Sequence, residues 1–186
     1  MEKESAMDNH GKLTVTIQRG QTVELRPLLP VDAPALRRLL IHPEIRPHVL
    51  LRGEPGAQSV YLNKLLKRLL SVSDPNELHL GVCHKGEQKL IGIVSLQNWI
   101  RREGRAMLGY ILDPAWWGCG FATEAVGLLL GYCVRELGVT RIEGRCRGNN
   151  SRSERVMLKN GMTLERLLPV AGTAEDVMKV FTLLHK

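Results

Sequence analysis

The chain has 186 residues, is 44% apolar and carries a formal net charge of +7. A chain of this length can bury about two thirds of its unfolded surface in one core, so we expect a single domain over residues 13–186. Its longest apolar stretch, Ala125 to Val134, is too short to cross a bilayer. Residues 1–12 lack the apolar core of a signal peptide, which indicates a flexible polar arm or tag remnant and predicts a cytoplasmic protein.

The positive charge is unevenly distributed. Between Arg141 and Lys159 there are six basic residues and two acidic ones. A local patch of this kind suits a small polyanion as well as a nucleic acid. Aromatic residues make up only 4% of the chain, which disfavours a platform for stacked bases, so we do not expect nucleic acid as the partner.

Cysteine and histidine positions give no sign of a metal site. The four cysteines lie far apart, without a CxxC pair or a histidine cluster at metal-ligand spacing, at Cys83, Cys119, Cys133 and Cys146. We therefore expect reduced thiols and no bound metal.

The first third of the chain reads as strands followed by helices. Short β-type runs at 13–17 and 23–28 predict one or two opening strands. A helix should follow, with Asp32 as a cap and Pro43 as a stop. The segment 42–56 is rich in proline and glycine and predicts a loop. After it, leucines at helical spacing predict an amphipathic helix: Leu62, Leu65, Leu66 and Leu69.

The middle of the chain changes to a period of two. Residues 78–99 alternate around Lys85-Gly86-Glu87 and predict a hairpin, and a turn at 102–104 leads to a third strand, 105–113. Helix and strand then alternate, and the predicted segments are a helix at 122–137, a strand at 140–147, a helix at 151–161 and final strands at 162–168 and 175–184. A meander followed by a crossover predicts an α+β domain with a mixed sheet.

Two glycines precede the longest predicted helix, in the string WGCGFATE at 117–124. Backbone N–H groups in the first turn of a helix have no partner inside the helix and lie at the positive end of its dipole. Glycine at 118 and 120 and alanine at 122 would let an anion approach these groups. A tight corner that requires positive φ is the alternative explanation of the glycines. The string matches neither a Walker loop nor a dinucleotide fingerprint.

The segment DPAWWGCGFATEAV resembles the pyrophosphate loop and helix of the GNAT superfamily of acyl-CoA N-acyltransferases. The string NNSRSERVMLKNGM resembles that superfamily's next motif, and the lead-in LGYILDPAWWG is similar to the branch that acetylates ribosomal-protein N-termini. The resemblance covers about Val23 to Leu184. It implies a GNAT-like α+β domain, with a central, mostly antiparallel mixed sheet whose splayed strands admit a pantetheine arm and with flanking helices.

The resemblance also implies a set of residues that bind acetyl-CoA, the expected cosubstrate. Backbone groups of Ile111 and Leu112 would bind pantetheine, and Asn150 would bind pantetheine or the splayed backbone. The pyrophosphate would meet the loop Trp117, Gly118, Cys119, Gly120, Phe121, Ala122 and Thr123. One of Arg147, Arg152 and Arg155 would meet the 3′-phosphate. Ser153 would lie near the thioester sulfur and protonate the departing thiolate.

The general base is harder to assign. Relatives in this branch commonly carry Glu where this chain has Met107, and methionine cannot accept a proton. Acyl transfer to an amine needs a group that removes a proton. The candidates are Glu103, in the adjacent turn, and four histidines: His42, His48, His79 and His84. Trp99 is a candidate for lining the acceptor pocket.

These inferences predict transfer of an acetyl group from acetyl-CoA to a primary amine by direct attack in a ternary complex. The amine would be a protein N-terminus, for example of a ribosomal protein, or a small polyamine-like or drug-like molecule. The missing glutamate leaves open a non-catalytic module that binds or senses CoA. The final strands, if exposed, could pair between subunits of a homodimer, and no contact with a membrane is expected.

Overall fold

The computed structural model describes residues 17–49, 55–71, 74–170 and 176–185. The polar arm predicted at 1–12 and residues 13–16 of the first predicted strand lie outside them, and so does 50–54 of the predicted loop. No helix in these ranges is long and apolar enough to span a membrane.

One sheet of eight strands runs through the molecule in the order β1-β2-β3-β4-β5-β6-β8-β7. The strands are β1 (Gln18–Arg19), β2 (Val23–Pro27), β3 (Leu78–His84), β4 (Lys89–Ile100), β5 (Arg105–Leu112), β6 (Arg141–Arg147), β7 (Thr163–Pro169) and β8 (Val177–Leu184). All neighbours are antiparallel except β5 and β6. The predicted α+β class and mixed, mostly antiparallel sheet are confirmed.

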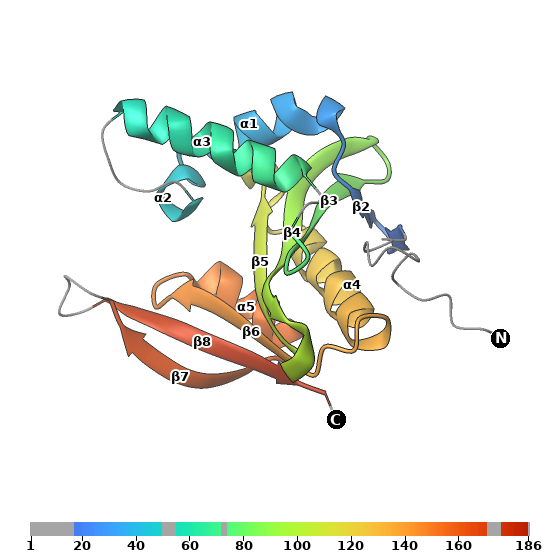
Figure 1. Cartoon of the computed structure of the whole chain (residues 1–186), viewed down its shortest axis with the longest axis vertical. Coiled ribbons are helices and arrows are strands. Elements are labelled where there is room, and N and C mark those ends of the chain that lie inside the picture. The colour runs from blue at the N-terminus through green and yellow to red at the C-terminus, as the bar shows by residue number, and fades with distance from the viewer. Residues whose placement is uncertain (1–16, 50–54, 72–73, 171–175, 186) are drawn as a thin grey trace.

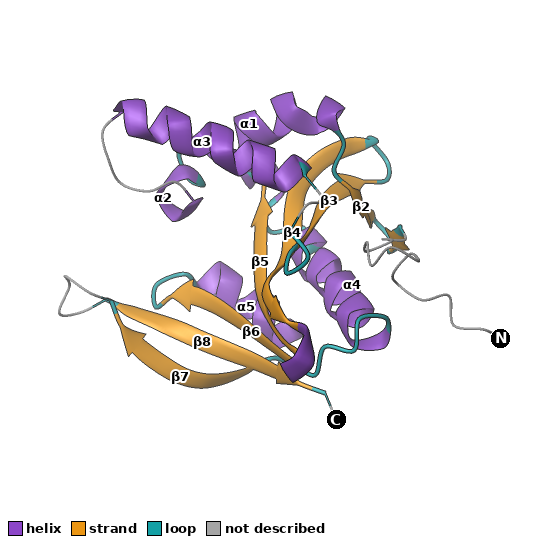
Figure 2. Cartoon of the chain, in the orientation of Figure 1, coloured by secondary structure: helices purple, strands orange, loops and turns teal. Residues whose placement is uncertain are grey.

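Helices cover both faces of this sheet (Figure 2). They are α1 (Ala33–Ile41), α2 (Arg46–Val49), α3 (Pro55–Leu70), α4 (Phe121–Arg135) and α5 (Ser151–Lys159). Single 3-10 turns at Pro30–Asp32 and Pro114–Trp116 connect strands to helices α1 and α4, and a third, at Arg101–Glu103, joins β4 to β5. Helices α1, α2 and α3 gather on one side, and α4 and α5 lie on the other (Figure 1).

Two apolar clusters hold these layers together. The larger lies between α4 and the sheet, and its centre includes Leu96, Leu129 and Phe181. The smaller lies under α1 and α3, where Leu36 and Leu62 meet Ile93 of β4. Successive residues of a strand face opposite sides, so β4 contributes to both clusters. The sheet is therefore fixed from both faces, and β5 sits at its centre.

Two local expectations need correction. Asp32 does not cap α1 with its side chain; its carboxylate accepts from the Leu29 amide at 2.8 Å and pairs with Arg26 at 2.7 Å. The proline- and glycine-rich segment also contains the short helix α2. Because Pro47 occupies an early helical position, where no N–H donor is needed, this proline does not break the helix.

Candidate active site

Strands β5 and β6 are paired over only part of their length. Their parallel register runs from Arg105 opposite Arg141 to Leu108 opposite Gly144. Beyond that point β5 stays with β4 as far as Leu112, whereas β6 stays with β8 as far as Arg147. The two strands therefore diverge, as Figure 1 shows, and open one backbone edge of β5 over residues 109–112.

Two cavities adjoin at this opening, with volumes of about 650 Å³ and about 540 Å³. We call the first the loop cavity, because the glycine loop lines it, and the second the α3 cavity, because α3 lines it. The residues that line both are Pro47, His48, Tyr110, Ile111, Asn150 and Ser153. A molecule in one cavity can therefore reach a molecule in the other through the gap between β5 and β6.

The glycine loop presents bare backbone to the loop cavity. Gly118 has φ of 82° and Gly120, the N-cap of α4, has φ of 87°. A Cβ at either position would meet no atom within 4 Å, so the space in front of the loop is open. The helix begins its own hydrogen bonding with the Glu124 amide, which donates to the Gly120 carbonyl at 3.0 Å. The amides of residues 121–123 thus precede the first helical bond and suit an anion.

Trp117 fixes this loop to the end of β5. Its indole Nε1–H donates to the Leu112 carbonyl at 2.7 Å. The Arg152 guanidinium lies 4.6 Å from the centre of the Trp117 ring and 3.9 Å from the Glu44 carboxylate. These contacts tie α5 and the α1–α2 connection to the rim of the loop cavity.

The start of α5 is held against β5 by its backbone. Asn150 caps the helix, since its Oδ1 accepts from the Ser153 amide at 3.1 Å. The Tyr110 hydroxyl donates to the Ser153 carbonyl at 3.0 Å. Burial raises the pKa of Tyr110 to about 12, so the phenol stays protonated and keeps this bond. The Ser153 side chain is thereby held where both cavities meet.

Most of the residues expected to bind the cofactor come together. Ten of them line the loop cavity: Ile111, Leu112, Trp117, Gly118, Gly120, Ala122, Thr123, Asn150, Ser153 and Arg155. Cys119 and Phe121 belong to the loop but do not line the cavity, and the exposed Cys119 thiol lies 3.7 Å from the Trp117 carbonyl. Arg152 lines the loop cavity, whereas Arg147 lines the α3 cavity.

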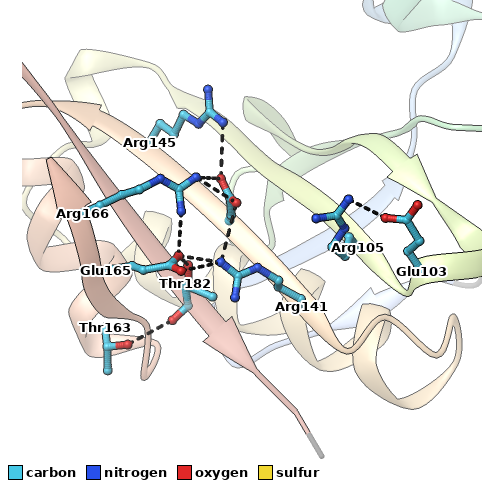
Figure 3. Close-up of polar contacts among 9 residues, drawn as sticks. Glu103, Arg105, Arg141, Arg145, Thr163, Glu165, Arg166 and Thr182 are labelled. Atoms are coloured by element: carbon cyan, nitrogen blue, oxygen red, sulfur yellow. Dashed lines mark hydrogen bonds and ion pairs between the residues drawn. The ribbon is translucent and has the colours of Figure 1, made fainter. Parts of the chain in front are cut away.

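Three base candidates and Trp99 line neither cavity. Glu103 turns to Arg105 at the far end of β5, as Figure 3 shows. His84 packs on Trp116 with ring centroids 4.7 Å apart, and the His42 Nδ1 accepts from the Glu44 amide at 3.2 Å. Trp99 is buried in the larger apolar cluster. The geometry does not bring Glu103 to Ser153.

His79 and His48 do line the α3 cavity. His48 is exposed on α2, whereas the His79 ring is held on both sides. Its Nδ1 lies 2.8 Å from the Ser95 hydroxyl and its Nε2 lies 3.0 Å from Glu77. Arg68 of α3 pairs with the same Glu77 carboxylate. Ser95 is opposite Gly109 in the sheet, so this chain of contacts ends at the opening between the strands.

Burial makes the His79 ring neutral. Desolvation and the Arg68 guanidinium lower its pKa to about 4, against an opposing effect of Asp74. Glu77 therefore contacts both the Arg68 guanidinium and the neutral His79 ring. A neutral ring that donates to a carboxylate has one nitrogen left as an acceptor. We therefore assign the N–H to Nε2, toward Glu77, which leaves Nδ1 to accept from Ser95.

This pKa predicts a pH dependence of stability. Between pH 6.5 and about 4 the unfolded chain binds the His79 proton and the folded chain does not. The free energy of unfolding should thus fall by about 3 kcal/mol as pH drops through this window, with no contribution above it. Urea unfolding at a series of pH values checks this. His79→Gln should lose that part of the slope and His84→Gln should keep it; equal slopes in all three proteins would contradict the assignment.

Met107 lies on the same face of the sheet as Ser95, opposite Gln97. Glu143 is its neighbour on β6. Burial would raise the pKa of Glu143, but hydrogen bonds from Arg166 and Arg145 outweigh it and lower the pKa below its usual value. Glu143 lines neither cavity, so it does not replace the glutamate that Met107 lacks.

The sequence interpretation missed Ser95, Glu77 and Arg68. Ser95 is the one polar residue in the apolar run Leu90 to Leu96, and its alternation with Ile93 places it on the α3 side. A buried serine in such a run needs a hydrogen-bond partner. The sequence therefore indicated that Ser95 has a partner. It could not identify His79, which is 16 positions away and is brought to Ser95 by the β3–β4 register.

The sequence of this chain matches the model of a known protein family. Residues 22–163 match the model of the Acetyltransferase (GNAT) domain. The chain is 38% identical over 105 residues to a probable N-acetyltransferase, YjcK, of Bacillus subtilis, covering 54% of this chain and 58% of the relative. It is 31% identical over 90 residues to the ribosomal-protein-serine acetyltransferase of Escherichia coli, covering 48% and 50%. The chain thus spans about half the length of the curated relatives it matches.

The fold is also similar to a solved structure with coenzyme A. A ribosomal L7/L12 alpha-N-protein acetyltransferase, RimL, in complex with coenzyme A superposes with a TM-score of 0.71 at 20% identity. The alignment covers 91% of this chain and 98% of that one. At this identity the likeness concerns the fold.

Proposed function

The chain belongs to the GNAT family of acetyltransferases, and we propose on that premise that it transfers an acetyl group from acetyl-CoA to a primary amine. The observation that carries the proposal is the meeting of the two cavities at the opening between β5 and β6. One side offers bare helix amides for a diphosphate, and the other offers a buried base. Both cavities are lined by Tyr110 and Ile111 of β5, in the part of the strand that β6 leaves unpaired.

On the cofactor side, the amides of the glycine loop would hold the diphosphate of acetyl-CoA. The open edge of β5 would pair with the pantetheine arm, much as another strand would. Arg155 and Arg152, which line the same cavity, would meet the remaining phosphate. In this arrangement the thioester would lie between Tyr110 and Ser153.

On the acceptor side, the proposed reaction needs a neutral amine, which attacks the thioester carbon and forms the C–N bond. A backbone N–H on the open edge of β5 would stabilise the charge on the thioester oxygen. Ser95 would pass the amine proton to His79 Nδ1, and Glu77 would stabilise the imidazolium that forms. The C–S bond then breaks, and the thiolate takes a proton through the Ser153 hydroxyl, which regains one from solvent. The His79 imidazolium releases the amine proton to solvent. His48, which lines both cavities, is the alternative base.

The test is release of the CoA thiol from acetyl-CoA across a panel of amines, with mass spectrometry of the products. We expect one thiol per acetylated amine. The panel should include peptides with free α-amino groups, among them ribosomal-protein N-termini, and polyamines. Tight CoA binding without turnover of any amine would instead support a module that binds or senses CoA, the alternative that Met107 motivates.

The proposal also covers the location, the acceptor and the oligomeric state of the protein. We place it in the cytoplasm, where acetyl-CoA is available, with a protein N-terminus as acceptor. A homodimer would form through β7, the edge strand of the sheet, which exposes Leu164 and Leu167.

A further inference from the structure

The charged residues that line the α3 cavity are all arginines: Arg68, Arg145 and Arg147. None of its described lining residues is an aspartate or a glutamate. Arg68 is paired with Glu77 behind the lining, so Arg145 and Arg147 carry the positive charge that an occupant meets, and a polycation would be repelled.

Two of these arginines stand at the opening between the strands. Gly144 is the last residue of β6 that pairs with β5, so Arg145 is the first residue beyond the pairing. Arg147 follows two positions later, on the same face and about 7 Å further along the strand. The two positive charges thus begin at the opening between β5 and β6 and continue along β6 away from it.

Arg145 shares its carboxylate partner, Glu143, with two other arginines. Glu143, whose side chain is 19% exposed, lies 3.3 Å from Arg145, whose side chain is 41% exposed. The same carboxylate also serves Arg166 at 3.2 Å and Arg141 at 3.8 Å. Figure 3 shows this network, in which Glu165 also pairs with Arg141 and Arg166. Three guanidinium groups share two carboxylates, which leaves a net positive charge.

The positive charge of Arg147 is neutralised even less completely. Within the described ranges Arg147 makes one ion pair, with Asp176 at 3.8 Å, and both side chains are well exposed, at 39% and 50%. A guanidinium with so loose a partner is free to take a carboxylate in a bidentate contact.

We propose that the acceptor is an acidic peptide N-terminus, with aspartate or glutamate within its first few residues. This rests on the proposed function, because it assigns the acceptor of the same site. The α-amino group would lie at the opening, near Ser95. The following side chains would run along β6, where an extended peptide keeps a spacing similar to that of Arg145 and Arg147.

The experiment measures binding of labelled peptides to the CoA-loaded protein by fluorescence anisotropy. Three peptides share an N-terminal serine and differ in the next three residues, which are acidic, neutral or lysine. We expect the acidic peptide to bind at least about tenfold more tightly than the lysine peptide, with a preference that shrinks at high salt. The double variant Arg145→Glu, Arg147→Glu should reverse the order.

Arg166→Glu is the matched control, because Arg166 shares Glu143 but does not line the cavity; the variant should keep the acidic preference. Equal binding of the acidic and lysine peptides to the wild-type protein, or an unchanged order in the double variant, would overturn the proposal. Thiol release is read on the same peptides. Selective binding without release would support the acidic acceptor while counting against acetyl transfer.

Discussion

His79→Gln should lower kcat/KM for amine acetylation by about 10² to 10⁴, the range typical of a lost general base. Glutamine can still contact Ser95 and Glu77, but it cannot take a proton. The ring is buried and neutral, so the loss should appear at every pH above about 5, given a pKa of about 4. Steady-state kinetics with acetyl-CoA and one peptide acceptor measure the effect, and the affinity for CoA should not change.

The pH profile separates this role from a structural one. If His79 is neutral throughout, the wild-type profile should rise only with deprotonation of the acceptor amine, at about pH 8 for an α-amino group. His84→Gln is the control, since this ring lines neither cavity. If His79→Gln kept full activity and His48→Gln lost most of it, the general base would be His48 of α2 and not His79.

Gly120→Val should weaken binding of CoA by at least about 100-fold. A side chain at φ of 87° is strained, and its Cβ would project into the space in front of the loop. Valine would thus cover the amides on which a diphosphate depends. Equilibrium dialysis with radiolabelled CoA measures the change.

The chain offers a matched control for strain at Gly138. This glycine has φ of 65° and open space at the Cβ position, but it follows the other end of α4. Gly138→Val should carry a similar backbone cost, about 1–3 kcal/mol, without loss of CoA affinity. If both variants weaken CoA binding equally, the effect belongs to folding and not to the loop.

Local patterns predicted most of the fold. The alternation around Lys85-Gly86-Glu87 and the helical run after Phe121 both correspond to observed elements, because each is decided by residues close in sequence. The sequence also predicted an open backbone loop before this helix, and Gly118 and Gly120 do have positive φ and line the loop cavity. Helix α2 was missed because a proline in a first helical turn resembles a proline in a loop.

The acceptor side was much less predictable. His79, Ser95 and Arg68 come from β3, β4 and α3, and only the packing of α3 on the sheet brings them together. Of the five candidate bases, sequence spacing gave no reason to prefer His79 over His84, which ends the same strand. Their difference is burial, which depends on contacts across the whole sheet.

The proposed function depends on one claim, that the amides at the start of α4 bind the diphosphate of CoA. Isothermal titration of the wild-type protein with CoA tests it most directly. We predict saturable binding of one CoA per chain, weakened when free pyrophosphate competes. No detectable heat or displacement at millimolar CoA, or a CoA affinity that pyrophosphate leaves untouched, would contradict the account.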